Sequence, residues 1–123
     1  METKFYRCPI CGNVTIKLVD SNVPLVCCGK IMEELKANTL EASVEKHLPV
    51  IERVDASAVM VRVGSAAHPM LPEHHICFVC LETEEGIQVA WLSEKPEAEF
   101  KTGAKVKAVY AYCNLHGLWK TEA

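Results

Sequence analysis

No apolar run in the sequence approaches the roughly 18 residues that a membrane-spanning helix needs, and the first residues, METKFYRC, lack the hydrophobic stretch of a secretory signal. Basic residues are not in excess either: 13 lysines and arginines stand against 16 aspartates and glutamates, which gives a net charge of -3. Binding to nucleic acid by phosphate neutralisation needs a basic surface, which this balance does not provide. We therefore expect a soluble cytoplasmic protein that binds neither membranes nor nucleic acid.

The chain of 123 residues is also too short for two large domains, because domains typically contain about 100 to 150 residues. Residues 1–36 contain four of the seven cysteines but few apolar side chains. A segment below roughly 40 residues usually needs a metal, disulfides or oligomerisation to fold. The polar segment ELKANTLEAS (34–43) is typical of a connector with a turn of helix. We place the boundary after Lys36, which predicts domains at 1–36 and 37–123.

Short segments rich in β-branched and aromatic residues follow the connector: LPVIERVD, AVMVRVG, HICFVCLE, IQVAWLSE and KVKAVYAYC. Two of them partly alternate between apolar and polar residues, as half-buried strands do. Turn signals such as Asp55, Gly64, Pro96 and Gly103 separate these segments at fairly regular intervals. The pattern predicts a mostly β protein in which a small metal-knuckle domain precedes an antiparallel β-sandwich.

The cysteines of the first domain form one candidate metal site. Cys8 and Cys11 belong to a Cys-x2-Cys turn, and Cys27 and Cys28 are adjacent in the chain. Seven cysteines cannot all pair within one chain, and clustered cysteines in a reducing cytoplasm more often bind metal than form disulfides. Four thiolates suit tetrahedral zinc or iron, and the ligand set alone does not choose between these metals.

A second candidate site involves histidines, all five of which lie in the second domain. Cys113 and His116 can bind one metal from a single turn. Neighbouring residues of a strand point to opposite faces, so His74 and His75 are not expected to reach the same ion. The candidate set is then His47, His68, His116, one of the pair His74 and His75, and the thiolate of Cys113. Five nitrogen and sulfur donors exceed what structural zinc binds, whereas iron with five protein ligands keeps one octahedral position open.

These motifs, CPICGN, VCCG, EKHLPV, AHPM, HHI and YCNLHGLWK, resemble in order the desulfoferrodoxin family, the two-iron superoxide reductases. The resemblance covers essentially the whole chain. It implies a desulforedoxin-like domain with iron on Cys8, Cys11, Cys27 and Cys28, followed by an immunoglobulin-like β-sandwich with a catalytic iron. The family pattern implies His47, His68, His74 and His116 as equatorial ligands and Cys113 as the axial ligand. It also implies that the last histidine binds through the opposite kind of ring nitrogen.

The family reaction is the one-electron reduction of superoxide to hydrogen peroxide, with electrons from rubredoxin or a similar small donor. By resemblance, Lys46 attracts the anion and helps to organise a protonating water, and Glu45 is the carboxylate that can occupy the sixth position of resting iron. In isolation, a Glu-Lys pair is usually just a solvated charged pair. The resemblance also implies a homodimer. Cys77, Cys80 and His75 are not expected to be ligands.

Two other functions fit parts of the sequence. A zinc-ribbon domain fused to a β-sandwich would make the protein an adaptor, because the tetrathiolate site alone is compatible with structural zinc. An electron-transfer protein would use both irons only to relay charge. The metal content separates the first alternative from an iron enzyme, and binding of azide or cyanide at the second iron separates the other.

Overall fold

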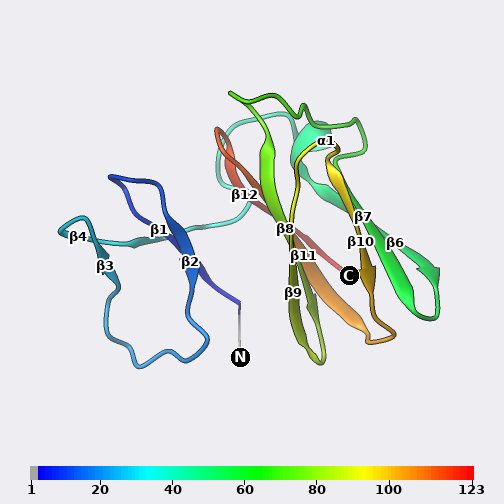
Figure 1. Cartoon of the computed structure of the whole chain (residues 1–123), viewed down its shortest axis with the longest axis horizontal. Coiled ribbons are helices and arrows are strands. Elements are labelled where there is room, and N and C mark those ends of the chain that lie inside the picture. The colour runs from blue at the N-terminus through cyan, green and yellow to red at the C-terminus, as the bar shows by residue number, and fades with distance from the viewer. Residues whose placement is uncertain (1–2) are drawn as a thin grey trace. The chain divides into compact units, whose positions relative to one another are not determined.

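The computed structural model describes residues 3–123, in which the chain divides into two compact units, with the division between Lys36 and Ala37. Figure 1 shows the first unit in blue to cyan and the strands of the second in green to red. Both units are built from antiparallel strands, and the predicted fold class, a mostly β protein with a β-sandwich, is confirmed.

The first unit contains two small sheets. The strand order in the larger is β2-β1-β5, and β3 pairs with β4 in the smaller. The strands are β1 (Phe5–Arg7), β2 (Val14–Ile16), β3 (Val26–Cys27), β4 (Lys30–Ile31) and β5 (Glu33–Glu34). Among the described residues of this unit, the buried hydrophobic side chains are Phe5, Cys8 and Met32. Such a small apolar core leaves the unit dependent on another source of stability.

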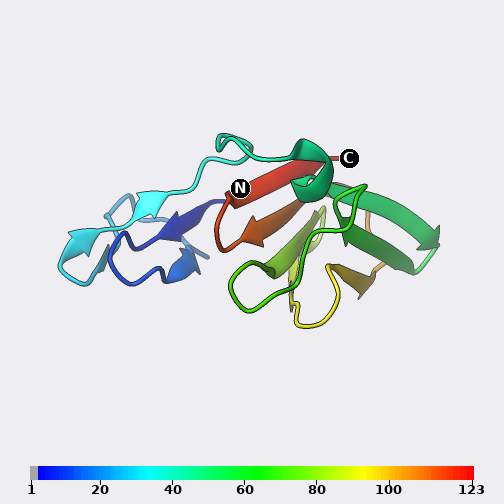
Figure 2. The ribbon, with the colours of Figure 1, turned by 90° about the horizontal axis from the view of Figure 1, so that it is seen from above.

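The second unit is a sandwich of two antiparallel sheets with the strand orders β10-β7-β6 and β12-β11-β8-β9. Its elements are α1 (Val44–His47), β6 (Pro49–Asp55), β7 (Ala58–Val63), β8 (Ile76–Thr83), β9 (Gly86–Trp91), β10 (Glu97–Lys101), β11 (Val106–Cys113) and β12 (Gly117–Glu122). Figure 2 shows the helical turn α1, in teal, leading directly into β6. No helix among residues 3–123 is long and apolar enough to cross a membrane.

The core of the sandwich lies between the inner faces of the two sheets. Alternate residues of β7, Val59, Val61 and Val63, are fully buried against residues such as Leu81 and Val109 of the facing sheet. This alternation is the one that the sequence predicts for AVMVRVG. Each fully buried valine or leucine contributes roughly 1.5 to 3 kcal/mol of transfer free energy. The second unit therefore has a hydrophobic core of its own.

The register of β8 and β11 shifts beside the histidine cluster. Tyr112 stands opposite Phe78, but Cys113 stands opposite Ile76, so Cys77 is an extra residue in β8. Such a bulge turns the strand, and it allows Ile76 to face the core together with Val79 although three positions separate them. The regular alternation of side chains along a straight strand therefore does not hold at this end of β8.

The structure corrects two details of the predicted elements. The helical turn is not in ELKANTLEAS but follows it, at Val44–His47. Two strands of the sandwich, β10 and β12, were not among the five predicted segments. The sequence of β10, EAEFK, has one buried apolar residue, Phe100, and three charges, because it is an edge strand with one face in water. Its apolar pattern was too weak to predict a strand.

Candidate metal centres

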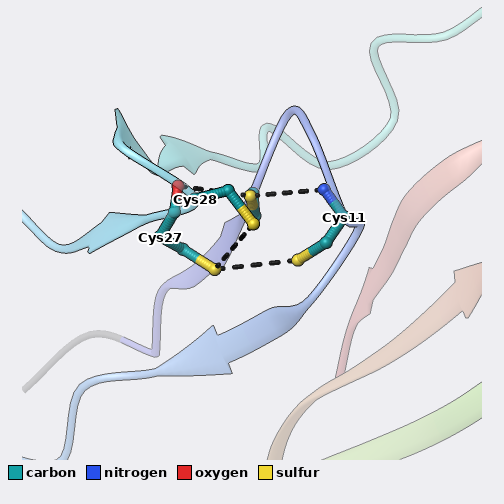
Figure 3. Close-up of side chains that lie close together, drawn as sticks. Cys11, Cys27 and Cys28 are labelled. Carbon is teal, nitrogen blue, oxygen red and sulfur yellow. Dashed lines mark hydrogen bonds between the residues drawn. The ribbon is translucent and has the colours of Figure 1, made fainter.

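The four cysteines of the first unit meet at one point. Cys8 and Cys11 come from the turn after β1, Cys27 ends β3, and Cys28 lies in the turn before β4. Their four sulfur atoms lie within 4.8 Å of one another. The Sγ atoms of Cys11 and Cys27 are 3.6 Å apart, and those of Cys27 and Cys28 are 3.9 Å apart. Figure 3 shows these sulfurs turned toward one another.

Backbone amides surround the sulfurs of the first turn. The N–H groups of Ile10 and Cys11 both donate to Cys8 Sγ at 3.4 Å, and the N–H of Asn13 donates to Cys11 Sγ at 3.5 Å. The N–H of Cys11, followed by that of Ile10, lowers the pKa of Cys8 to about 6, although burial of the thiol opposes this effect. This turn is therefore suited to hold thiolates, the form that binds metal.

The adjacent pair reaches the same point because of the backbone at Cys28. Cys28 has a φ of 54°, in the left-handed region, and Gly29 follows at 72°. This reversal directs the sulfurs of Cys27 and Cys28 to one side, which an extended chain would not do. The neighbouring sulfurs, that of Cys11 first, raise the pKa of Cys28 to about 12. A metal cation would offset this crowding and let all four residues bind as thiolates.

The second cluster is a ring of four imidazoles from distant parts of the second unit. His47 belongs to α1, His68 and His74 to the connection from β7 to β8, and His116 to the turn after β11. Neighbouring ring centroids are 4.7 Å apart for His47 and His68, 4.6 Å for His68 and His74, 5.1 Å for His74 and His116, and 4.9 Å for His116 and His47. Across the ring, His47 and His74 are 6.3 Å apart.

Hydrogen bonds on the outside of the ring fix two of the tautomers. His47 Nδ1 lies 2.6 Å from the carbonyl oxygen of Ser43, and His68 Nδ1 lies 2.7 Å from that of Pro69. A carbonyl only accepts, so each Nδ1 carries the proton and donates it. The Nε2 atoms of His47 and His68 therefore present lone pairs to the interior, where they are 3.2 Å apart.

The other two histidines complete the interior in different ways. His74 Nε2 is the one buried side-chain nitrogen or oxygen among residues 3–123 without a hydrogen-bond partner. A buried polar atom without a partner is costly, and a metal ion would satisfy it. His116 presents its other nitrogen, because its Nδ1 lies 3.1 Å from His47 Nε2. The residues present thus fit a metal held by imidazole nitrogens.

Cys113 supplies a sulfur next to the ring. It is fully buried, and its Sγ accepts a hydrogen bond of 3.4 Å from the backbone N–H of His116. Cys113 Sγ and nitrogens of His47, His68 and His74 lie within 4.8 Å of one another. His116 is outside this set, but its Nδ1 is 3.8 Å from Cys113 Sγ.

Burial favours the neutral form of three of the imidazoles, those of His47, His68 and His74. Desolvation lowers the pKa of His68 to about 4, and it also lowers the pKa values of His47 and His74. Neutral imidazole is the form that binds metal. Trp119, which no sequence pattern indicated, contacts two histidines of the ring. Its ring centroid is 4.9 Å from that of His47, and its Nε1 donates to the carbonyl of His116 at 3.0 Å.

The remaining predicted residues surround this cluster. Glu45 and Lys46 precede His47 in α1, and both side chains are exposed. His75 is not part of the ring: its Nδ1 donates to the carbonyl of Leu71 at 2.9 Å, and its backbone N–H donates to Asn114 Oδ1 at 2.8 Å. Cys80 is buried and Cys77 is partly buried, and neither belongs to a metal-binding cluster within the described residues.

Fold and clusters together define a protein with two candidate metal centres, a tetrathiolate on a small β unit and a histidine-cysteine set on a β-sandwich. The family model of desulfoferrodoxin matches residues 39–122. A desulfoferrodoxin of Syntrophotalea carbinolica is 44% identical over 123 residues, which covers 98% of this chain and 97% of that protein. The chain therefore belongs to the desulfoferrodoxin family, and the predicted resemblance is confirmed.

Proteins named superoxide reductases are also similar to this chain. The crystal structure of the superoxide reductase from Treponema pallidum matches with a TM-score of 0.83 and 36% identity, over 99% of this chain and 100% of that one. A superoxide reductase of Pyrococcus abyssi is 42% identical over 99 residues, which covers 63% of this chain and 85% of that protein.

Proposed function

We propose that the protein is a superoxide reductase that converts superoxide, one electron and two protons into hydrogen peroxide at the histidine-cysteine centre. The observation that carries this proposal is the convergence of four imidazoles and the Cys113 thiol on one buried point, with His74 Nε2 left without a partner. The similarity to superoxide reductases supports the same activity.

Five donors favour iron over structural zinc at this centre. Structural zinc is almost always four-coordinate, whereas five protein donors leave one position of an octahedron for a small reactant. Ferrous iron bound to His47, His68, His74, His116 and Cys113 would supply the electron. The hydrogen bonds to Ser43 and Pro69 hold two imidazoles in the tautomer that this binding requires.

Lys46 acts on the substrate through its charge. Superoxide is an anion and the chain carries a net charge of -3, so a local cation is needed to draw the substrate to the site. Lys46 is exposed and directly precedes the ring residue His47 in α1, which supports this role. Its Nζ also orders a water that donates a proton to the product. Glu45 would supply a carboxylate that can bind the iron in its resting state.

We assign the four cysteines of the first unit to a second iron. This iron would hold residues 1–36 in their fold and serve as a relay for electrons from rubredoxin or a similar small donor. A homodimer in the cytoplasm completes the proposal. Superoxide and the donor are then the only partners that the function requires.

Mixing the reduced, iron-loaded protein with pulse-generated superoxide in a stopped-flow instrument tests the activity. We expect superoxide to disappear in a bimolecular reaction that yields one peroxide per superoxide and no dioxygen. Release of dioxygen would mean dismutation, and the absence of both peroxide formation and oxidation of the second centre would refute the proposal.

Elemental analysis tests the metals independently. Two irons per chain support the proposal, while two zincs would instead make the protein an adaptor. If azide and cyanide leave the spectrum of the second iron unchanged, that iron has no open position, and a pure electron-transfer function replaces the proposed one.

A further inference from the structure

Gly64 directly follows the strand β7 and lies against the backbone of α1. Its φ is 52°, and a Cβ at this position would lie 2.6 Å from the carbonyl carbon of Lys46 and 2.7 Å from the Cα of Lys46, with the carbonyl oxygen of Glu45 closer still. All three atoms belong to the backbone, so no side-chain rotation could make room. Only glycine allows this approach without moving α1.

The close approach lets the turn after β7 hold a carbonyl of α1. The backbone N–H of Ala66 donates to the carbonyl oxygen of Glu45 at 2.9 Å, and Ser65 Oγ donates to the same oxygen at 3.2 Å. The last carbonyls of any helix lack partners within the helix. Residues 65 and 66 provide the partners that the carbonyl of Glu45 would otherwise lack.

α1 needs such an anchor because it is a single turn. It has four residues, and its N-cap residue Ser43 makes no side-chain capping hydrogen bond. An isolated turn of this length is unstable, since nucleation fixes several dihedral angles for one hydrogen bond. The position of Glu45, Lys46 and His47 therefore depends on contacts outside the turn.

The same turn leads to a second histidine of the ring. His68 follows Gly64 by four positions, and its backbone N–H donates to the carbonyl of Val63 at 3.0 Å. Gly64 is thus the contact between α1, which contains His47, and the turn that leads to His68. A displacement of α1 at this contact would move Glu45 and Lys46, together with His47, relative to the other three imidazoles.

We propose that Gly64 is a positioning residue, which holds the backbone of α1 against the turn after β7 and thereby sets where Lys46 and Glu45 stand at the histidine-cysteine centre. The consequence for the reaction rests on the proposed function. The anchoring itself does not, and it can be measured separately.

Three variants separate the close approach from backbone strain. Gly64→Ala introduces both a Cβ and a residue that disfavours positive φ. Gly64→Asn introduces the same Cβ, but asparagine tolerates the left-handed region much better. Gly86→Ala is the control, because Gly86 has a φ of 139° and no atom within 4 Å of the position of a Cβ. This substitution introduces backbone strain in the same unit without a clash with α1.

Hydrogen exchange, read by mass spectrometry on the iron-loaded full chain, tests the anchoring. We expect peptides with residues 44–48 and 64–68 to exchange about tenfold faster in both Gly64 variants and unchanged in Gly86→Ala. Equal exchange in the wild type and both Gly64 variants would overturn the proposal. The proposal would also be overturned if exchange were fast in Gly64→Ala but returned to the wild-type rate in Gly64→Asn, since backbone strain would then explain the effect.

The reaction with superoxide tests the consequence. In Gly64→Ala we expect the bimolecular rate constant to fall about tenfold and its dependence on salt to flatten, because Lys46 no longer stands at the site. A merely structural role would lower the melting temperature and leave the salt dependence unchanged, which would refute the positioning role.

If Gly64→Ala loses iron, its rate constant cannot be interpreted, and Ser65→Ala then provides a milder test of the same contact. It removes only the hydroxyl bond to the carbonyl of Glu45. We expect changes in the same directions, about two- to threefold in the rate constant and exchange rate. Unchanged rates would count against the anchoring. If the wild type fails to reduce superoxide, the proposed function is wrong, while the exchange experiment still decides whether Gly64 anchors α1.

Discussion

The two units of the chain bring metal ligands together by different means. In the first unit a candidate ligand is itself part of the core, since Cys8 is one of the three buried hydrophobic residues that the structure describes there, with Phe5 and Met32. In the second unit ten buried residues form a core cluster, and the histidines lie on turns and strand ends beside it. We therefore expect the first unit to need a metal to fold, and the second unit to fold without one and to offer a preformed site.

The candidate ligands of the two centres also differ in how far they are buried. Cys11 and Cys28 are exposed, and both lie on turns between strands of two or three residues. His47, His68 and Cys113 are buried, and hydrogen bonds from outside the ring fix the orientation of the histidines. A tetrathiolate uses all four tetrahedral positions, but four imidazoles and one thiolate leave a sixth octahedral position. With these proposed ligand sets, we expect the second centre to be the one that binds a substrate.

Replacing Cys113 by serine should have the largest effect. We expect Cys113→Ser to abolish superoxide reduction, because buried Cys113 supplies the one sulfur of the second cluster among the described residues. The visible spectrum of the first centre should stay intact, which is the internal control. Stopped-flow rates with superoxide make the measurement. An unaffected rate constant would show that Cys113 is not a ligand that matters for the reaction.

Metal removal should separate the two units. After chelation, we expect amides of β1 and β2 to lose about a hundredfold in protection from hydrogen exchange, because that unit has few buried side chains. Amides of β8 and β11 should keep their protection. Readdition of iron is the control and should restore β1 and β2. Equal loss of protection in both units would contradict the expectation that only the first unit needs a metal to fold.

Lys46→Ala tests electrostatic attraction at the second centre. We expect the rate constant with superoxide to fall about tenfold at low salt and to depend less on salt, since the cation that draws the anion is gone. Lys101→Ala is the matched control, because Lys101 pairs with Ala58 at the opposite end of β7 from Val63. An equal effect of both substitutions would assign the attraction to net charge.

His75→Ala should have the smallest effect. His75 points away from the ring and donates to the carbonyl of Leu71. We expect the iron content to remain unchanged and the rate constant to stay within about twofold. Loss of the second iron in this variant would place His75 among the ligands.

The sequence predicted those parts of the structure that depend on residue type and spacing. Alternating valines placed β7, and the motifs with Cys27, Cys28 and the histidines identified the residues that the structure brings together. The features that the sequence did not predict depend on tertiary contacts. The bulge at Cys77 arises from pairing with β11, and the close approach of Gly64 to α1 follows from how two turns pack. A lone glycine at the end of a strand segment was the only local signal.

Some missed features have no distinct pattern in the chain. The carbonyls of Ser43 and Pro69 fix histidine tautomers, but any residue has a carbonyl, so no side chain marks these positions. The left-handed backbone at Cys28 likewise follows from the turn between β3 and β4. It explains why adjacent cysteines can share one centre, which their spacing alone made difficult to understand.

The most direct test of the separation between the two centres is the single-turnover reaction of Cys28→Ser with superoxide. The variant is reduced, its second iron is verified by elemental analysis, and the rate constant and peroxide yield are compared with those of the wild type. We predict that both values stay within about twofold of the wild type, although the spectrum of the first centre is lost. Loss of superoxide reduction in a variant that retains the second iron would contradict the assignment of the reaction to that centre alone.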